Sequence, residues 1–196
     1  MPSFWGTAPN LNFAVNRLNH SYTLLDRIVS VIQGVIGGLQ GGSGAAAPNA
    51  NVEKGVQWAI AIANDDSHGY SQSVRWGPSY DCSSFMTSAM RQAGFNIGGG
   101  EGVYTGNMIE YFTAAGFTWH PAPANRRLPA SMLRRGDIML NTGHHTQMYI
   151  GNNQDVNAGS TKNGIYVTSH NEYYTYGSPQ GWDGFLRYEK TVEHVQ

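Results

Sequence analysis

The chain has 196 residues, which is enough for one domain of ordinary size and an additional segment. Hydrophobic residues make up 40% of the sequence and charged residues only 13%, which excludes a disordered chain extended by its own charge. Because 12 basic residues balance 13 acidic ones, the composition provides no basic field for nucleic acid or an anionic membrane. The single cysteine, Cys82, excludes an internal disulfide and a multi-cysteine zinc site.

The first 39 residues carry a heptad pattern. Apolar residues follow one another at alternating spacings of four and three, which predicts a helix that attaches the chain to other proteins or to further copies. These positions are Leu11, Val15, Leu18, Tyr22, Leu25, Val29, Ile32, Ile36 and Leu39. The alternative is an amphipathic helix that lies on its own domain.

The sequence predicts neither a secretory signal nor a membrane span near the N-terminus. The start of the chain lacks a basic n-region, and the apolar run at 28–39 is broken by glycines and shorter than the ~20 residues that a bilayer requires. Residues 40–50, rich in Gly, Ala and Ser, read as a flexible linker. We therefore expect a helical segment over 1–39, a linker over 40–50 and a folded domain over 51–196.

Helices precede strands in residues 51–196. Helices are predicted from an N-cap at Asn51, from the string DCSSFMTSAMRQAGF, and over 107–116. Short strands are predicted over 136–140, 146–151, 165–169 and 184–188, with a further extended stretch at DVNAGS. This order is typical of an α+β fold with a mainly antiparallel sheet.

Cys82 lies at the first turn of the second predicted helix. The free N–H groups there and the positive end of the helix dipole can lower the pKa of a thiol, which favours a nucleophile. The alternative is a small buried hydrophobic residue.

A thiol nucleophile needs a base, and His145 is the best candidate. His145 shares a predicted strand face with Gln147, and Asn157 falls on the next extended stretch, where it can hydrogen-bond the imidazole. His144 is the rival base, but neighbouring residues of a strand point to opposite faces. A zinc site built from His144, His145 and Asp137 is a weaker alternative, because the spacing lacks the H-x-x-x-H pattern. Of the other histidines, His20, His120, His170 and His194 are predicted to be exposed.

Several motifs in order resemble one known family. The strings YDCSSFMTSAMRQAGF, RRGDIML, GHHTQMYIGNN and NAGS, within residues 52–188, resemble the NlpC-type cysteine peptidase superfamily and, more narrowly, the phage peptidoglycan hydrolases grouped as amidase 5. The resemblance implies a papain-like α+β fold with the cysteine at a helix N-terminus packed on a small sheet. It also implies that Cys82 is the nucleophile, His145 the base and Asn157 the orienting residue, where the superfamily often has His.

The same resemblance implies hydrolysis of an amide bond in peptidoglycan, without cofactor or metal, by an N-acetylmuramoyl-L-alanine amidase or a stem-peptide endopeptidase. We expect a lysin carried on the phage tail through residues 11–39, or a released endolysin, acting on the bacterial cell wall. The alternative is a catalytically silent tail component with the same fold. Tyr70 is the candidate oxyanion donor, Asp81 is expected to bond the helix start, and Trp76 is a candidate substrate contact.

Overall fold

The computed structural model describes residues 50–160 and 164–190, so the predicted heptad helix and nearly all of the predicted linker lie outside the described residues. The α-helices are α2 (Ala50–Ala63), α3 (Cys82–Gln92) and α4 (Met108–Ala114). The strands are β1 (Phe117–Pro121), β2 (Ile138–Asn141), β3 (His145–Gly151), β4 (Gln154–Gly159), β5 (Gly164–Ser169) and β6 (Gly184–Tyr188). Short 3₁₀ turns occur at Gly100–Gly102, Thr105–Asn107 and Ala130–Met132. The predicted α+β order is confirmed.

The strands form one antiparallel sheet in the order β1-β6-β2-β3-β4-β5. β3 and β4 are neighbours joined by a tight turn, as the sequence predicts, and their register pairs Met148 with Val156. Because side chains alternate along a strand, this register puts His145, Gln147 and Asn157 on one face of the sheet.

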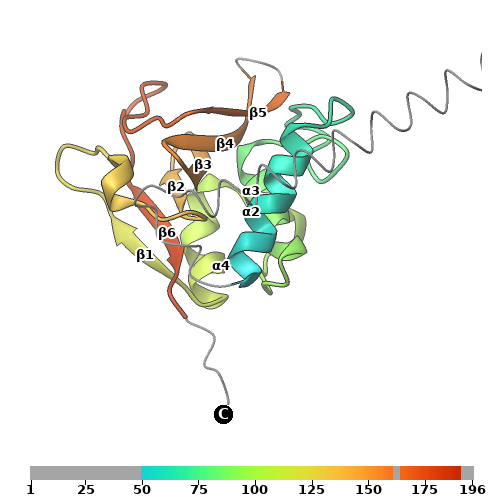
Figure 1. Ribbon diagram of the computed structural model, residues 1–196, viewed down its shortest axis with the longest axis horizontal. Helices are drawn as coiled ribbons and strands as arrows, with labels where there is room; N and C mark the ends of the chain where they lie inside the picture. The colour runs from blue at the N-terminus through green and yellow to red at the C-terminus, as the bar shows by residue number, and fades with distance from the viewer. Residues whose placement is uncertain (1–49, 161–163, 191–196) are drawn as a thin grey trace, which may run out of the picture. The chain divides into compact units, whose positions relative to one another are not determined.

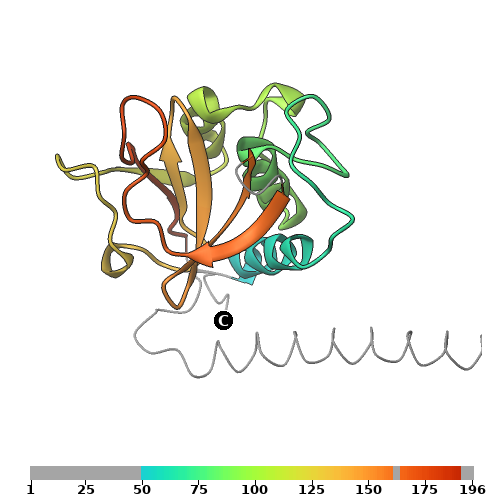
Figure 2. The same ribbon diagram turned by 90° about the horizontal axis from the view of Figure 1, so that it is seen from above.

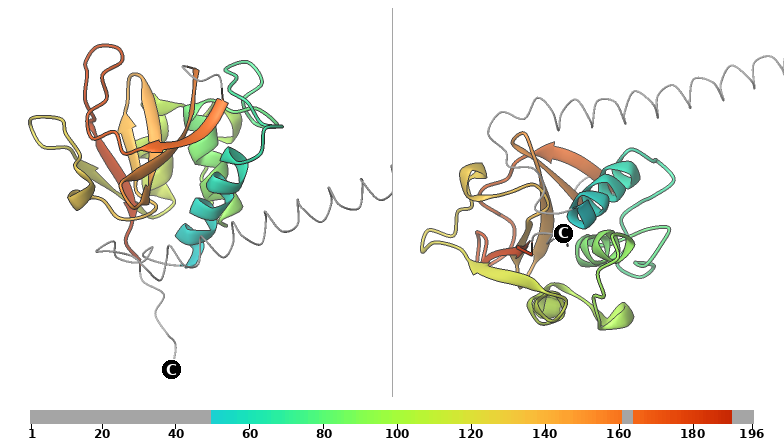
Figure 3. Two further views of the ribbon diagram at one scale, coloured as in Figure 1. Left: turned by 45° about the horizontal axis from the view of Figure 1, so that its top comes forward. Right: turned by 60° about the horizontal axis from the view of Figure 1, so that its bottom comes forward.

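The helices gather on one face of the sheet, and loop segments cover the other (Figures 1 and 2). The core between helices and sheet includes Val56, Phe85, Met90, Met148 and Val156. A smaller apolar cluster on the opposite face contains Leu128, Leu133, Met139, Tyr149, Trp182 and Phe185. Segments 122–133 and 170–183 lie on this second side (Figure 3). The sheet is therefore buried on both faces.

Gly136 shows how closely α2 approaches the turn before β2. Its φ is +95°, in the left-handed region that favours glycine, and a Cβ there would lie 2.1 Å from Cγ1 of Val52. Glycine thus permits both the turn and the contact with α2.

Several elements differ from the prediction, and β2, for example, begins at Ile138 and not at 136. Asn51 lies inside α2 and is not its N-cap. α4 covers only Met108–Ala114, since a 3₁₀ turn precedes it. The strand β1 was not predicted. Among the strands of the described residues it pairs with β6 alone, so its terminal Pro121 is tolerated at a sheet edge. Among the described residues, no helix has the length and apolar character needed to cross a membrane.

Candidate active site

The start of α3 places Cys82. Asp81 is the N-cap, and its carboxylate accepts a hydrogen bond from the Ser84 N–H at 2.8 Å while the Ser84 hydroxyl accepts one from the Asp81 N–H at 3.0 Å. This reciprocal capping box fixes the first turn, as expected for Asp81. Cys82 is the first residue of the helix and is buried.

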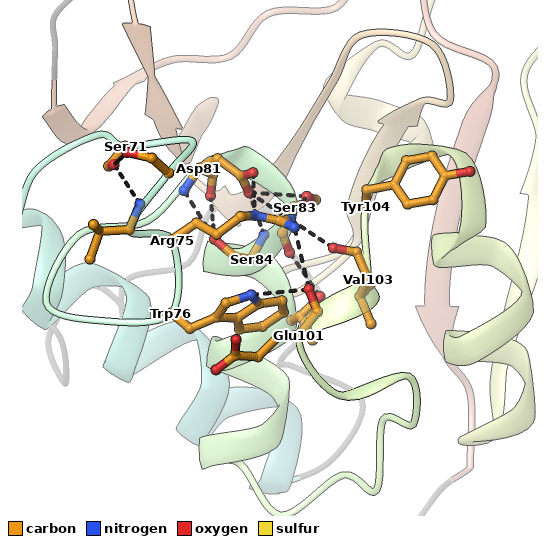
Figure 4. A network of polar contacts seen from close by, with 12 residues as sticks. Ser71, Arg75, Trp76, Asp81, Ser83, Ser84, Glu101, Val103 and Tyr104 are labelled. Atoms are coloured by element: carbon orange, nitrogen blue, oxygen red, sulfur yellow. Dashed lines mark hydrogen bonds and ion pairs between the residues drawn. The ribbon is translucent and has the colours of Figure 1, made fainter.

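A network around Arg75 holds this turn in place (Figure 4). The guanidinium forms an ion pair with Asp81 and donates to the Ser83 hydroxyl and the Val103 carbonyl oxygen, each at 2.7 Å. Trp76, the candidate substrate contact, lies next to the guanidinium groups of Arg75 and Arg91, each 5.1 Å from its ring centroid. Its indole N–H donates to the Glu101 carbonyl at 3.1 Å. The contacts of Trp76 thus hold the loop before Val103.

His145 begins β3, and its ring is hydrogen-bonded to the side chain of Asn157 on β4. Asn157 is buried and also hydrogen-bonds Tyr166, which stands opposite it on β5. The next residue on that face of β4 is Gly159, where a Cβ would lie 2.7 Å from the Tyr166 hydroxyl and 3.1 Å from Oδ1 of Asn157. His145 and Asn157 are thus neighbours, and Tyr166 is a third member of this group that the sequence did not indicate.

The Cys82 sulfur lies against the start of β3. Besides the N–H groups of Cys82 and Ser83, it accepts a hydrogen bond from the backbone N–H of Thr146, the residue after His145. Burial raises the pKa of Tyr70 and of Tyr174, and both lie near enough to Cys82 that the charge of its thiolate raises each pKa further. The structure therefore brings Cys82, Tyr70 and the His145–Thr146 strand end to one place.

The pKa values of Cys82 and His145 are shifted in opposite directions. Burial, aided by the Asp81 carboxylate, raises the pKa of Cys82 to about 11, although the three backbone N–H groups lower it. Burial lowers the pKa of His145 to about 4, opposed by the hydrogen bond to Asn157. At neutral pH the pair is therefore a neutral thiol and a neutral imidazole. The expected lowering of the thiol pKa by the helix terminus is wrong here, because desolvation outweighs the backbone donors.

His144 is directed elsewhere. Its Nε2 lies 2.9 Å from the Ser178 carbonyl oxygen, and its ring packs so closely on Gly177 that a Cβ there would lie 2.7 Å from it. Asp137 is buried and paired with Arg187, with Nε and Oδ1 2.9 Å apart. The side chains of the zinc alternative thus have other partners, and the described part of the chain contains no cluster of three or more His, Cys, Asp or Glu residues suited to a metal.

Two other histidines differ from the prediction of simple exposure. The side chain of His170 is 3% exposed and lies 3.0 Å from Asp155, which is fully buried. His120 lies on β1, where it stacks on Phe185 and lies 3.1 Å from Glu189. Both are held by tertiary partners distant in sequence, which a local pattern does not indicate. His20 and His194 lie outside the described residues.

Comparison with known families identifies the chain. The model of the bacteriophage peptidoglycan hydrolase family, amidase 5, matches residues 51–191, which is more than half of the sequence. The chain belongs to this family. The resemblance drawn from the motifs around Cys82 and His145 is thereby confirmed.

Individual relatives share parts of this region. A lysin of Pneumococcus phage Dp-1 is 33% identical over 141 residues, covering 66% of this chain and 44% of the lysin. The murein DD-endopeptidase MepS/murein LD-carboxypeptidase of Escherichia coli K12 is 41% identical over 61 residues, covering 29% of this chain and 32% of that protein. The chain therefore spans less than half the length of these curated relatives.

Two solved structures are also similar. The peptidoglycan hydrolase RipB of Mycobacterium tuberculosis aligns with a TM-score of 0.44 and 19% identity, over 96% of this chain and 94% of RipB. The P60 domain of an antigen from M. avium subspecies paratuberculosis aligns with a TM-score of 0.43 and 18% identity, over 70% of this chain and 96% of that domain.

Proposed function

We propose that the chain hydrolyses an amide bond of bacterial peptidoglycan, with Cys82 as nucleophile, His145 as general base and acid, and Asn157 as the residue that orients the imidazole. The observation that carries this proposal is the junction of α3 and β3, where the Thr146 N–H donates to the Cys82 sulfur while Asn157 bonds the ring of His145. Membership in a peptidoglycan hydrolase family supports the substrate class.

The chemistry begins from a neutral pair. A proton that moves from a thiol of pKa about 11 to an imidazole of pKa about 4 moves uphill, so its transfer is coupled to formation of the carbon–sulfur bond. His145 takes the thiol proton as sulfur attacks the carbonyl carbon, and the negative charge passes to the carbonyl oxygen. The backbone N–H of Cys82 and the Tyr70 hydroxyl are the proposed donors to this oxyanion.

Collapse of the tetrahedral intermediate breaks the carbon–nitrogen bond, and His145 gives its proton to the departing amine. A thioester between the substrate and Cys82 remains. His145 then takes a proton from a water molecule, whose oxygen attacks the thioester carbon. Release of the carboxylic acid returns the proton to sulfur and restores the neutral pair.

Digestion of purified peptidoglycan under reducing conditions tests the proposal, with products identified by mass spectrometry. We expect soluble products from the natural chain and none from Cys82→Ala. A new amino terminus on L-Ala would identify an N-acetylmuramoyl-L-alanine amidase, whereas one within the stem peptide would identify an endopeptidase. If the natural chain releases no more product than Cys82→Ala, the catalytically silent tail component is the better account.

We further propose that residues 11–39 attach this domain to the phage tail or to further copies of the chain, and that it acts on the cell wall from there. The support is the heptad pattern itself. A free endolysin that is released to the wall has no need of such an attachment, which makes the state of association the distinguishing property.

A further inference from the structure

The segment between β5 and β6 brings two aromatic rings to His145. The Tyr174 ring is stacked on the imidazole, with centroids 5.1 Å apart and planes 16° apart. Trp182 is fully buried, 5.2 Å from Tyr174 and 6.4 Å from His145. The three rings form one cluster, in which one face of the imidazole is covered by a phenol rather than by water.

A buried ion pair anchors the beginning of this segment. Nδ1 of His170 lies 3.0 Å from Oδ1 of Asp155, and the two side chains are 3% and 0% exposed. The Asn171 N–H donates to the same carboxylate at 2.7 Å, and Nε2 of His170 lies 2.7 Å from the Leu128 carbonyl oxygen. Such an arrangement satisfies both ring nitrogens of His170 and ties the segment to β4, the strand that also carries Asn157.

The end of the segment is tied back to its beginning. The Gly181 N–H donates to the Tyr174 carbonyl oxygen, and the Trp182 indole N–H donates to the Asn171 carbonyl oxygen at 2.8 Å. The Trp182 N–H donates to the Arg126 carbonyl at 2.9 Å. Because both ends are held, the position of the Tyr174 ring is set by the fold and not by its contact with His145 alone.

We propose that Tyr174 is a positioning residue, whose ring holds the imidazole of His145 toward Cys82 and excludes water from the covered face. The reaction that this serves rests on the proposed function, but the positioning itself is a property of the protein without substrate. The groups near the imidazole are Asn157 from β4 and Tyr174 with Trp182 from the segment before β6. The Cys82 sulfur, from α3, accepts a hydrogen bond from the backbone N–H of the next residue, Thr146. The low pKa of His145, caused by burial, agrees with this arrangement.

The test uses the full chain and three variants. Tyr174→Phe keeps a ring to stack, whereas Tyr174→Ala removes it, and Tyr174→Gln retains much of the volume without a ring. The titration of His145 is followed by NMR of ¹³C-labelled histidine, with His145→Gln to assign its signal. We expect Tyr174→Phe to titrate as the natural chain does, and both other variants to titrate nearer to the ordinary value of about 6.5.

Catalytic activity provides a second readout, because removal of the Tyr174 ring predicts a particular pH dependence of kcat/KM. An imidazole with a pKa of about 6.5 is only about one quarter neutral at pH 6 and almost fully neutral at pH 8. Protonation alone therefore predicts that kcat/KM of Tyr174→Ala falls about fourfold at pH 6 relative to its value at pH 8, with rescue in Tyr174→Phe.

An unchanged His145 titration in both ringless variants would overturn the positioning role, as would failure of Tyr174→Phe to retain the natural titration. If Tyr174→Ala does not fold, the decision rests on Tyr174→Gln and Tyr174→Phe. The titration needs no substrate, so a chain that proves inactive on peptidoglycan would contradict the proposed function without deciding the role of Tyr174.

Discussion

At the residue scale, Cys82, the proposed nucleophile, occupies a site with opposing influences on its charge. Three backbone N–H groups favour a thiolate, while burial and the neighbouring Asp81 carboxylate disfavour it. Asp81 also has a structural role, because it caps α3 and forms an ion pair with Arg75. Asp81, which fixes the start of α3 and with it Cys82, therefore also raises the pKa of Cys82.

Alkylation of the thiol tests this balance. Iodoacetamide reacts with the thiolate, so we expect the rate for Cys82, measured by mass spectrometry, to keep rising between pH 8 and pH 9.5. Asp81→Asn removes the negative charge and keeps an oxygen for the cap, so alkylation at pH 8 should be about tenfold faster, equivalent to about one pKa unit. The exposed Asp66→Asn is the control and should react as the natural chain does. A rate that levels off near pH 7 in the natural chain would contradict the raised pKa.

At the scale of elements, the sequence predicted the start of α3 and the β3–β4 hairpin because each is local, whereas the packing of the helix on the sheet was implied by the family resemblance. Asp81 precedes a helical pattern, and His145 and Asn157 flank one tight turn. Tyr166, Tyr174 and Trp182 were not predicted as neighbours of His145, since β5 and the segment before β6 reach the site only through tertiary folding. The sequence shows that these three residues are aromatic, but their spacing does not distinguish them from aromatic residues of the hydrophobic core.

The approach of α2 to the turn before β2 gives a prediction at the same scale. Gly136→Ala adds left-handed strain and a clash with Val52, so we expect the free energy of unfolding in urea to fall by about 3 to 4 kcal/mol. Gly94 has nearly the same φ, +94°, and nothing within 4 Å of the position of a Cβ. Gly94→Ala should therefore cost only the strain, about 1 to 2 kcal/mol. Equal losses in the two variants would show that the contact with Val52 contributes nothing.

For the whole molecule, the family match covers residues 51–191, and the role of the segment before it rests on its sequence pattern. Residues 11–39 remain a prediction, because apolar spacing alone does not distinguish a helix that joins other chains from one that lies on its own domain.

Mass measurement in solution addresses this segment. We expect the mass of the full chain in light scattering to exceed that of a monomer. Leu25→Asp places a charge among the apolar heptad positions and should reduce the mass to that of the monomer. Thr23→Asp lies between the apolar heptad positions Tyr22 and Leu25; it is the control and should leave the mass unchanged. A strictly monomeric natural chain would contradict self-association through residues 11–39, and of the two proposed forms of attachment docking to another protein would then remain.

The central claim is that Cys82 acts with His145 and not with its neighbour. The most direct measurement is the rate of product release from purified peptidoglycan by His145→Ala and His144→Ala, each compared with the natural chain and with Cys82→Ala. Because Asn157 bonds the ring of His145 while His144 contacts the Ser178 carbonyl, we expect His145→Ala to fall to the level of Cys82→Ala and His144→Ala to retain most of the rate. Loss of activity in His144→Ala with retention in His145→Ala would contradict the account.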